Sequence, residues 1–162
     1  MADVIKEIIT PTRLEYTMYA GTAQKRFLRG LQNGRILAQR CPQCSKVYIP
    51  PRGSCPTCAV ATREEVQVAD AGTVTTFCIV DLPFYGQAVE IPYVCASILL
   101  DGADIPFFAL IQEVPAVDVR MGMRVRAVWE EADKRQPNFT AIKYFKPTGE
   151  PDAAYETYKD HL

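Results

Sequence analysis

The sequence predicts a mostly β protein with a short helical N-terminal part, a small cysteine-rich unit and a five-stranded barrel. Three observations carry this prediction. Helical spacing precedes Gly34 and recurs only briefly in the tail, four of the six cysteines form two close pairs, and strand-length apolar segments follow residue 64. A chain of 162 residues with 48% hydrophobic residues can form one domain, or two small ones that share a core. The expected segments are a helical arm 1–34, a cysteine ribbon 35–63, a barrel 64–146 and a tail 147–162.

The helical part is expected to begin after an irregular arm over residues 1–11. Two short helices follow in the prediction, Thr12–Ala20 and Thr22–Asn33. Thr22 carries the side-chain oxygen that a helix N-cap uses, and apolar residues recur every four positions in the second helix. Gly34 stands where a left-handed residue ends a helix, so the second helix is expected to stop there.

Two Cys-Pro-x-Cys pairs follow the helices, at Cys41, Cys44, Cys55 and Cys58. Each Cys-x-x-Cys turn points two sulfurs at one position, and two such turns present four thiolates in the tetrahedral arrangement that suits Zn²⁺. Two disulfides or a redox pair are the alternatives, although disulfides conflict with a cytoplasmic location. Four cysteine ligands leave no open coordination position, so the zinc is expected to be structural rather than catalytic.

Segments of strand type surround and follow the cysteines. Arg35–Arg40 and Val47–Ile49 are expected to form a hairpin around the first pair. Val66–Ala69 and Gly72–Asp81 resemble one long strand that bends near the intervening glycine, as a barrel corner requires. The four later strands are expected at Tyr93–Leu100, Pro106–Gln112, Arg124–Glu130 and Phe139–Phe145. Five strands with a bent first strand suit a closed Greek-key barrel of the OB type, with an open sandwich as the alternative.

Composition excludes several classes of protein. The longest apolar runs, such as Val94–Leu100, are far shorter than a membrane span, and Met1–Thr10 carries acids without a secretory apolar core. We therefore expect a cytoplasmic protein. The single histidine, His161, lies one residue from the end of the chain. A Ser-His-Asp, Cys-His or multi-histidine centre is therefore not expected, and no catalytic residue is assigned.

Two segments do not belong to the expected strands of the barrel. The connection Pro83–Ile91 is long and apolar, so it either folds back over the barrel or forms an interface or pocket lid. The acidic tail is expected either to fray or to dock on a partner. The residues assigned to a partner interface are Phe84, Tyr85, Val89 and Ile91 of the connection, and Tyr155 and Tyr158 of the tail.

The remaining cysteines, Cys78 and Cys95, lie within two of the expected strands. A free cysteine in such an apolar segment is expected to be a small buried hydrophobic residue. A catalytic thiol is the alternative, and it would need an activating base that the neighbouring sequence does not provide.

Charge is distributed unevenly along the chain. Residues 1–63 contain ten Lys or Arg against three acids, whereas residues 64–162 contain eight against sixteen. Seven bases and no acid lie between Lys25 and Arg52. Such a segment attracts phosphates or an acidic partner, and a solvated surface is the alternative interpretation.

The motifs together resemble a family of zinc-ribbon plus OB-fold proteins associated with acyl-CoA metabolism, long carried under a domain-of-unknown-function label. The resemblance covers about Gly21–Pro147. It rests on Phe27, Gly34, both cysteine pairs, Pro50-Pro51-Arg52, Ala71-Gly72-Thr73-Val74, Pro92-Tyr93-Val94 and Gly122-Met123-Arg124-Val125. The family usually has glycine after each cysteine pair, where this chain has Ser45 and Ala59; these residues can adopt the required backbone at some cost.

The resemblance implies a non-catalytic accessory subunit. Members associate with thiolase-superfamily enzymes, namely thiolases, aldolases and related synthases, or with enoyl-CoA hydratases, and the partner supplies the catalytic cysteine and histidines. A heterotetramer with two copies of each chain is the simplest symmetric complex. Acyl-CoA is then the ligand of the complex, and structural zinc is the cofactor of this chain.

The basic segment suits the phosphates of coenzyme A. Arg52 follows two prolines that stiffen its backbone, and a guanidinium can bind a phosphate through two hydrogen bonds. Arg40 and Lys46 are further candidates for the phosphates, and Tyr48 is a candidate for stacking on adenine. Surface charges and a packed aromatic residue are the alternative interpretations.

Two other classes of function stay open at this point. Zinc ribbons and OB folds both bind nucleic acids, although the acidic barrel half opposes a phosphate backbone. A stand-alone acyl-CoA hydrolase is the other class, and it lacks an evident base. The identity of the neighbouring gene separates the accessory-subunit class from the nucleic-acid class most cheaply.

Overall fold

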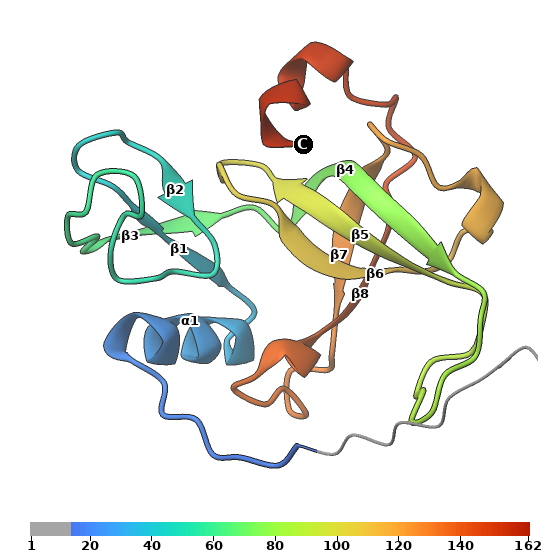
Figure 1. Ribbon diagram of the computed structural model, residues 1–162, viewed down its shortest axis with the longest axis horizontal. Coiled ribbons are helices and arrows are strands. Elements are labelled where there is room, and N and C mark those ends of the chain that lie inside the picture. The colour runs from blue at the N-terminus through green and yellow to red at the C-terminus, as the bar shows by residue number, and fades with distance from the viewer. Residues whose placement is uncertain (1–13) are drawn as a thin grey trace, which may run out of the picture.

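The computed structural model describes residues 14–162. A small sheet with one helix lies on one side of a β-barrel, and the connection between strands β4 and β5 projects on the other side (Figure 1). The predicted arm over residues 1–11 and the start of the first predicted helix lie outside the described residues. No helix in the described part of the chain is long and apolar enough to cross a membrane.

A single α-helix, α1 (Thr22–Gln32), forms in the N-terminal part. Residues 14–20 are not helical, so the prediction of a first helix is wrong there. The large apolar side chains of this segment stay exposed, with Tyr19 at 94%, so they do not pack against the rest of the chain. An isolated short helix without such packing is marginal in water. The N-cap of α1 is Gly21 without a side-chain cap, so the expected capping by Thr22 is also wrong.

The end of α1 follows the prediction closely. Gly34 adopts a φ of 69°, in the left-handed region. The Arg35 backbone N–H donates to the Gly30 carbonyl at 2.9 Å, and the Gly34 N–H donates to the Leu31 carbonyl at 3.0 Å. These two bonds form a Schellman motif, which glycine favours because it has no Cβ. The chain therefore reverses into the first strand at this position.

Three strands form the ribbon sheet in the order β2-β1-β3. They are β1 (Ile36–Arg40), β2 (Val47–Tyr48) and β3 (Glu64–Val68). All are antiparallel, with Ile36 opposite Val68 and Arg40 opposite Val47. The expected single bent strand is therefore wrong: its first half, β3, pairs with the ribbon, and only the second half enters the barrel.

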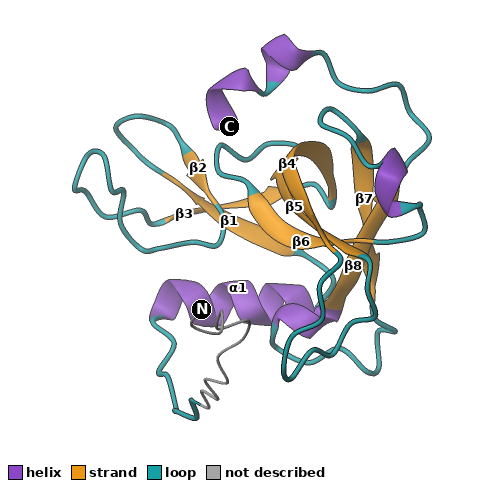
Figure 2. Ribbon diagram, turned by 45° about the vertical axis from the view of Figure 1, so that its right-hand side comes forward, coloured by secondary structure: helices purple, strands orange, loops and turns teal. Residues whose placement is uncertain are grey.

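The barrel contains five strands in the closed order β4-β5-β6-β8-β7 (Figure 2). They are β4 (Ala71–Val80), β5 (Tyr93–Leu100), β6 (Phe107–Ile111), β7 (Arg124–Trp129) and β8 (Ile142–Pro147). A parallel contact between Ile111 and Phe145 closes the sheet. The barrel confirms the predicted OB-type architecture and excludes the open sandwich.

One continuous core joins helix, ribbon and barrel. Phe27 and Leu31 of α1 are fully buried and belong to the same cluster as Ile36 of the ribbon and Val74 and Phe145 of the barrel. The alternating burial along β5, from Val94 to Leu100, places every second side chain in this core. The ribbon and the barrel are therefore packed as one unit, which positions the cysteines relative to the barrel.

The C-terminal tail packs against the chain itself. It forms two 3-10 turns, Tyr155–Thr157 and Lys159–His161, and buries Tyr158 to 5% exposure. The Ala153 N–H donates to the Gly122 carbonyl at 2.8 Å, and Nδ1 of His161 lies 2.9 Å from the Asp104 carbonyl. The expectation of a frayed terminus is therefore wrong, because these bonds and Tyr158 hold the tail to the barrel.

Candidate functional site

The four cysteines of the ribbon form a metal-ligating cluster. Their sulfurs all lie within 4.8 Å of one another, and the Sγ atoms of Cys44 and Cys55 are 3.7 Å apart. Zinc–sulfur bonds of about 2.3 Å in tetrahedral geometry place the sulfurs about 3.8 Å apart. The cluster therefore has the size that a zinc ion requires, as the spacing predicted.

The turns that carry the sulfurs are built alike. The N–H of Cys44 lies 3.5 Å from the Cys41 sulfur, and the N–H of Cys58 lies 3.4 Å from the Cys55 sulfur. Ser45 and Ala59 follow the pairs with φ values of 60° and 56°. Both non-glycine residues thus adopt the left-handed backbone that the turn needs, as expected, in a region that side chains with a Cβ disfavour.

The pKa values of two of these thiols are shifted in opposite directions. The Tyr48 hydroxyl lies 3.2 Å from the Cys55 sulfur, and this hydrogen bond lowers the pKa of Cys55 to about 6. Burial among the other sulfurs raises the pKa of Cys58 to about 12. A divalent ion bound between them would compensate the charge of all four thiolates and would hold the two turns together. A zinc ion held this way supplies folding energy and has no open position for a substrate.

Tyr48 belongs to this cluster and not to a ligand surface. It is 2% exposed, and the hydrogen bond with Cys55 raises the pKa of its hydroxyl to about 12. The ring is therefore covered by the ribbon and cannot stack on an adenine. The prediction of adenine stacking by Tyr48 is wrong because a two-residue strand, β2, places the ring against the cysteines.

One of the three predicted phosphate-binding cations, Arg52, lines a groove. Arg40 is engaged by its own chain, since Nη1 donates to the Ser45 carbonyl at 3.1 Å and Nε lies 3.5 Å from Glu64. Lys46 is exposed on the hairpin. Arg52 is exposed and lines a groove of about 520 Å³ between Gly21–Gln24 and Pro50–Gly53. The structure therefore places only Arg52 of these three side chains at the groove beside the first turn of α1.

The backbone beside Arg52 is held firmly. The Gln39 amide oxygen is buried and accepts from the Gly53 N–H and from the Thr62 hydroxyl, each at 3.0 Å. The Gly53 carbonyl in turn accepts from the Thr62 N–H at 3.0 Å. These contacts fix the exit from the prolines to the second cysteine turn, so Arg52 projects from a rigid segment.

The basic segment is partly neutralised by acids that are distant in sequence. Nη1 of Arg26 lies 2.9 Å from Glu65, and Arg40 contacts Glu64, both on β3. Pairing of β3 with β1 brings these acids to the ribbon. The cationic surface is thus narrower than the sequence indicates.

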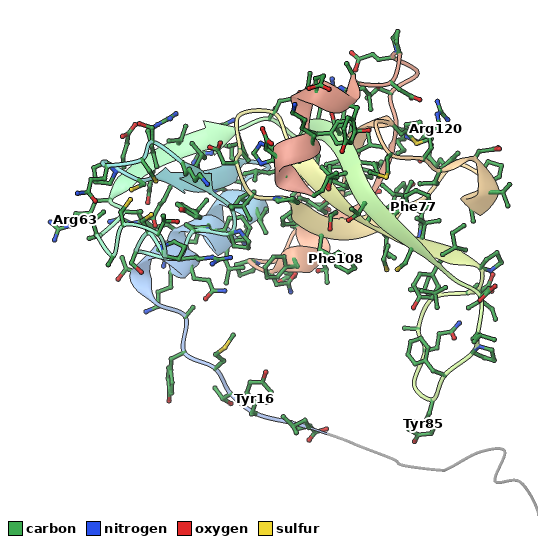
Figure 3. All side chains as sticks on the ribbon, turned by 45° about the horizontal axis from the view of Figure 1, so that its top comes forward. Tyr16, Arg63, Phe77, Tyr85, Phe108 and Arg120 are labelled. Atoms are coloured by element: carbon green, nitrogen blue, oxygen red, sulfur yellow. The ribbon has the colours of Figure 1, made fainter. Side chains whose placement is uncertain are left out.

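The connection between β4 and β5 exposes its aromatic residues. Tyr85, at the tip of the connection, is 93% exposed, and Phe84 is 55% exposed (Figure 3). Val89 is half-buried, and Ile91 is 37% exposed. The aromatic part of the connection therefore does not fold back over the barrel, and for it the expected alternatives reduce to an interface or a lid. In the tail, Tyr155 is exposed but Tyr158 is buried beneath it, so Tyr158 cannot contact a partner in this conformation.

An apolar groove on the barrel was not predicted. Its volume is about 440 Å³, and its wall includes Phe107, Phe108, Phe139 and Ile142. Phe108 is 66% exposed and lies on the barrel surface between the connection and the ribbon (Figure 3). Alternation along β6 could have revealed it, because Phe107 points into the core and its neighbour must point outward.

Cys78 departs from the prediction for the two remaining cysteines. It is exposed, whereas Cys95 is half-buried. A bulge between Val74 and Thr76 shifts the register of β4, so that Cys78 faces outward. The expectation of a buried hydrophobic residue is therefore wrong for Cys78.

Two family models match successive parts of the chain. One, described as the ChsH2 rubredoxin-like zinc ribbon domain, matches residues 29–62, and the other, the ChsH2 C-terminal OB-fold domain, matches residues 65–130. A DUF35 domain-containing scaffold protein from Methanocaldococcus jannaschii is 35% identical over 117 residues, covering 69% of this chain and 81% of that protein. A probable enoyl-CoA hydratase alpha subunit from Thermomonospora curvata is 31% identical over 113 residues, covering 70% of this chain but 34% of that longer protein.

Solved structures share the fold. A chain from a structure described as the Ltp2-ChsH2(DUF35) aldolase superposes with a TM-score of 0.62 at 23% identity, covering 81% of this chain and 98% of that one. A DUF35-family protein of unknown function from Sulfolobus solfataricus superposes with a TM-score of 0.61 at 19% identity, covering 80% and 87%.

Proposed function

Because the chain belongs to the DUF35 family of zinc-ribbon and OB-fold proteins, we propose that it is a non-catalytic accessory subunit of a thiolase-type enzyme in acyl-CoA metabolism. Three similarities support this class of role. One relative is named a scaffold protein, a second is named a subunit of an enoyl-CoA hydratase, and a similar solved structure is described as an aldolase that contains a DUF35 chain. The complex would lie in the cytoplasm, where the four thiols are kept reduced.

The exposed aromatic surface is the observation that carries the proposal. We define the docking surface as Phe84, Tyr85, Ile91 and Phe108, which belong to the β4–β5 connection and the adjoining barrel face. Their exposed fractions are 55%, 93%, 37% and 66%. Large aromatic side chains left in water favour association, because an interface core is enriched in them and burial stabilises the complex. A thiolase-fold dimer that carries one copy on each subunit gives the two-plus-two complex.

We assign catalysis to the partner because the histidine and the ribbon thiols of this chain are held in structural contacts. The ring of His161, the one histidine, bonds the Asp104 carbonyl, and the ribbon thiols surround the metal position. These groups hold the fold together, so the nucleophile, base and oxyanion donors are assigned to the partner. The zinc ion would keep the ribbon rigid, and the shared core would keep the docking surface in a fixed position relative to it.

Arg52 is the residue of this chain that we assign to the coenzyme A phosphates. It stands on a rigid segment and faces a groove that also contains the first turn of α1. The first intrahelical bond runs from Lys25 to Gly21, so the preceding N–H groups point out of the helix beside Arg52. Binding at this remote end would position the thioester at the partner's catalytic residues. Arg40 and Lys46 would add only long-range attraction.

Co-expression with the thiolase-like protein of the neighbouring gene tests the docking. The two chains should elute together at micromolar concentration, and native mass spectrometry should give two copies of each. The double variant Phe84→Ser, Tyr85→Ser should weaken the complex by at least about tenfold, because the loss of two aromatic anchors costs more than about 1.4 kcal/mol. Val117→Ser is the matched control, as Val117 is 84% exposed outside the docking surface. Separate elution of the wild-type chains would contradict the proposal.

The nucleotide contact is tested in the assembled complex. Arg52→Ala should weaken use of an acyl-CoA by about tenfold to a hundredfold, as a charge-assisted contact contributes about 1.5–3 kcal/mol. It should affect an acyl-pantetheine thioester much less, because that substrate lacks the nucleotide phosphates. Lys134→Ala is the control, since Lys134 pairs with Glu131 at the surface. Equal losses for both substrates would remove Arg52 from the nucleotide, and tight binding of a single-stranded oligonucleotide would favour the nucleic-acid class instead.

A further inference from the structure

Cys78 and Cys95 stand directly opposite each other on neighbouring antiparallel strands. The alternate residues Val94 and Ala96 of β5 are buried in the barrel, so Cys95 between them faces outward. Beyond the bulge, Cys78 also faces outward, because its neighbour Phe77 packs against the core. Both thiols therefore lie on the same outer face, and the pair is separate from the four ribbon cysteines.

The register gives a spacing that a disulfide can bridge. Directly opposed residues of an antiparallel pair have Cβ atoms about 4.5–5.5 Å apart, while a disulfide needs about 3.5–4.5 Å. The difference is small enough for a local adjustment of the two strands. A bond made this way is strained and hence readily reduced, which is typical of regulatory rather than permanent disulfides.

We propose that Cys78 and Cys95 form a reversible cross-strand disulfide, which makes this face of the barrel a redox-modification site. Cys78 is the exposed member and meets the oxidant first. Burial, with a smaller contribution from the nearby Cys78 sulfur, raises the pKa of Cys95, so Cys95 keeps its proton until the second step.

In the net reaction, the two thiols and one hydrogen peroxide give the disulfide and two water molecules. The Cys78 thiolate attacks one oxygen of hydrogen peroxide, the O–O bond breaks, and a sulfenic acid and hydroxide form; the hydroxide takes up the proton that Cys78 released and becomes the first water. The Cys95 sulfur then attacks the Cys78 sulfur, the S–O bond breaks, and the second oxygen leaves as water with the Cys95 proton. The two thiols lose two electrons in total, and the peroxide gains them. A dithiol reductant reverses the change.

The position of the pair gives the modification a consequence. Cys78 and Cys95 lie near the ends of β4 and β5 from which the apolar connection projects (Figure 1). A disulfide there would fix the spacing of the two strands that the connection with Phe84 and Tyr85 joins. This consequence rests on the proposed function, whereas formation of the disulfide does not. Oxidised and reduced chains should then differ in their affinity for the partner.

The zinc-loaded full chain permits a direct test, because its cleavage sites separate the cysteines. No Lys or Arg lies between Arg63 and Arg120, so trypsin leaves Cys78 and Cys95 together in one peptide and releases the ribbon cysteines in others. After treatment with hydrogen peroxide and alkylation in denaturant, this peptide should lose both alkylation sites and two hydrogen atoms. Further cleavage after Glu90 should leave its two halves joined until a dithiol is added.

Two variants keep the result interpretable. In Cys95→Ser, the joined peptide should vanish, and dimedone should label Cys78 as the sulfenic acid. In Cys78→Ser, the less accessible Cys95 should resist the same peroxide dose. The proposal fails if the wild-type peptide keeps both alkylation sites, if Cys78 passes directly to the sulfinic acid, or if the link forms between two chains. Any of these results leaves the docking proposal untouched, because partner binding by the reduced chain is measured separately.

Discussion

Asp104 joins the metal ribbon to the barrel, and its replacement tests that junction. One carboxylate oxygen accepts from the Val47 N–H at 2.8 Å, and the Asp104 N–H donates to the Val47 carbonyl at 3.0 Å. Val47 is only 2% exposed, so water cannot readily replace the carboxylate. In Asp104→Ala the backbone bond remains, but the Val47 donor is left buried and unsatisfied. The expected cost is about 1.5–3 kcal/mol, which corresponds to the loss of a hydrogen bond to a charged group.

Urea unfolding of the zinc-loaded protein measures this cost. Trp129 reports on the barrel, because its indole N–H donates to Asp70 at 3.1 Å and the ring lies under Arg135. Asp104→Asn keeps an oxygen that can accept from Val47, so it should cost about half as much as the alanine variant. The midpoint should fall while the urea dependence stays unchanged. If Asp104→Ala lowers the free energy of unfolding by less than about 0.5 kcal/mol, or if both variants lower it equally, the Asp104 carboxylate does not stabilise the junction between ribbon and barrel.

Three further predictions use the same unfolding assay. Gly72→Ala should cost at least about 2 kcal/mol, because an added Cβ would lie 2.3 Å from the Leu99 carbonyl oxygen; an unchanged midpoint would contradict the close approach. Ala59→Gly should stabilise the zinc-loaded chain by about 0.5–1 kcal/mol by relieving the positive φ, whereas the control Ala61→Gly should not. Glu113 accepts hydrogen bonds from Tyr144 and, with a smaller effect, from Lys146, and these bonds hold its pKa below the usual range. The stabilisation that they give is therefore present above the pKa of Glu113 in the unfolded chain, and it is lost as pH falls through the lower pKa of Glu113 in the folded chain. Tyr144→Phe should therefore be less stable than wild type near pH 7 and approach it in acid, and a difference that is independent of pH would be evidence against this contact.

The local parts of the fold could be predicted from sequence because short-range physics determines them. The cysteine spacing dictates the two metal turns, and the missing Cβ of Gly34 ends α1 where the sequence indicates. Tyr93–Leu100 forms β5 within its predicted limits, since a short apolar segment bounded by a proline and an Asp-Gly turn is typical of a strand.

The long-range parts could not be predicted in the same way. Alternation shows which face of a strand is buried but does not identify its partner, so the pairing of β3 with β1 was not foreseen. That pairing also decides which bases meet acids, as Arg26 and Glu65 illustrate. The bulge after Val74 exchanges the faces of β4, which exposes Cys78. Tyr48 carries an aromatic ring that suits either a ligand or a core, and only the cysteines packed around it decide between them.

Reconstitution of activity tests the central claim most directly. Consumption of a CoA thioester is measured for this chain alone, for the thiolase-like neighbour alone, and for the two combined with zinc present. The accessory role predicts that this chain alone has no activity and that its addition raises the activity of the partner, with the increase lost in Phe84→Ser, Tyr85→Ser. Thioester consumption by this chain alone, or a partner whose activity is the same with and without it, would contradict the claim.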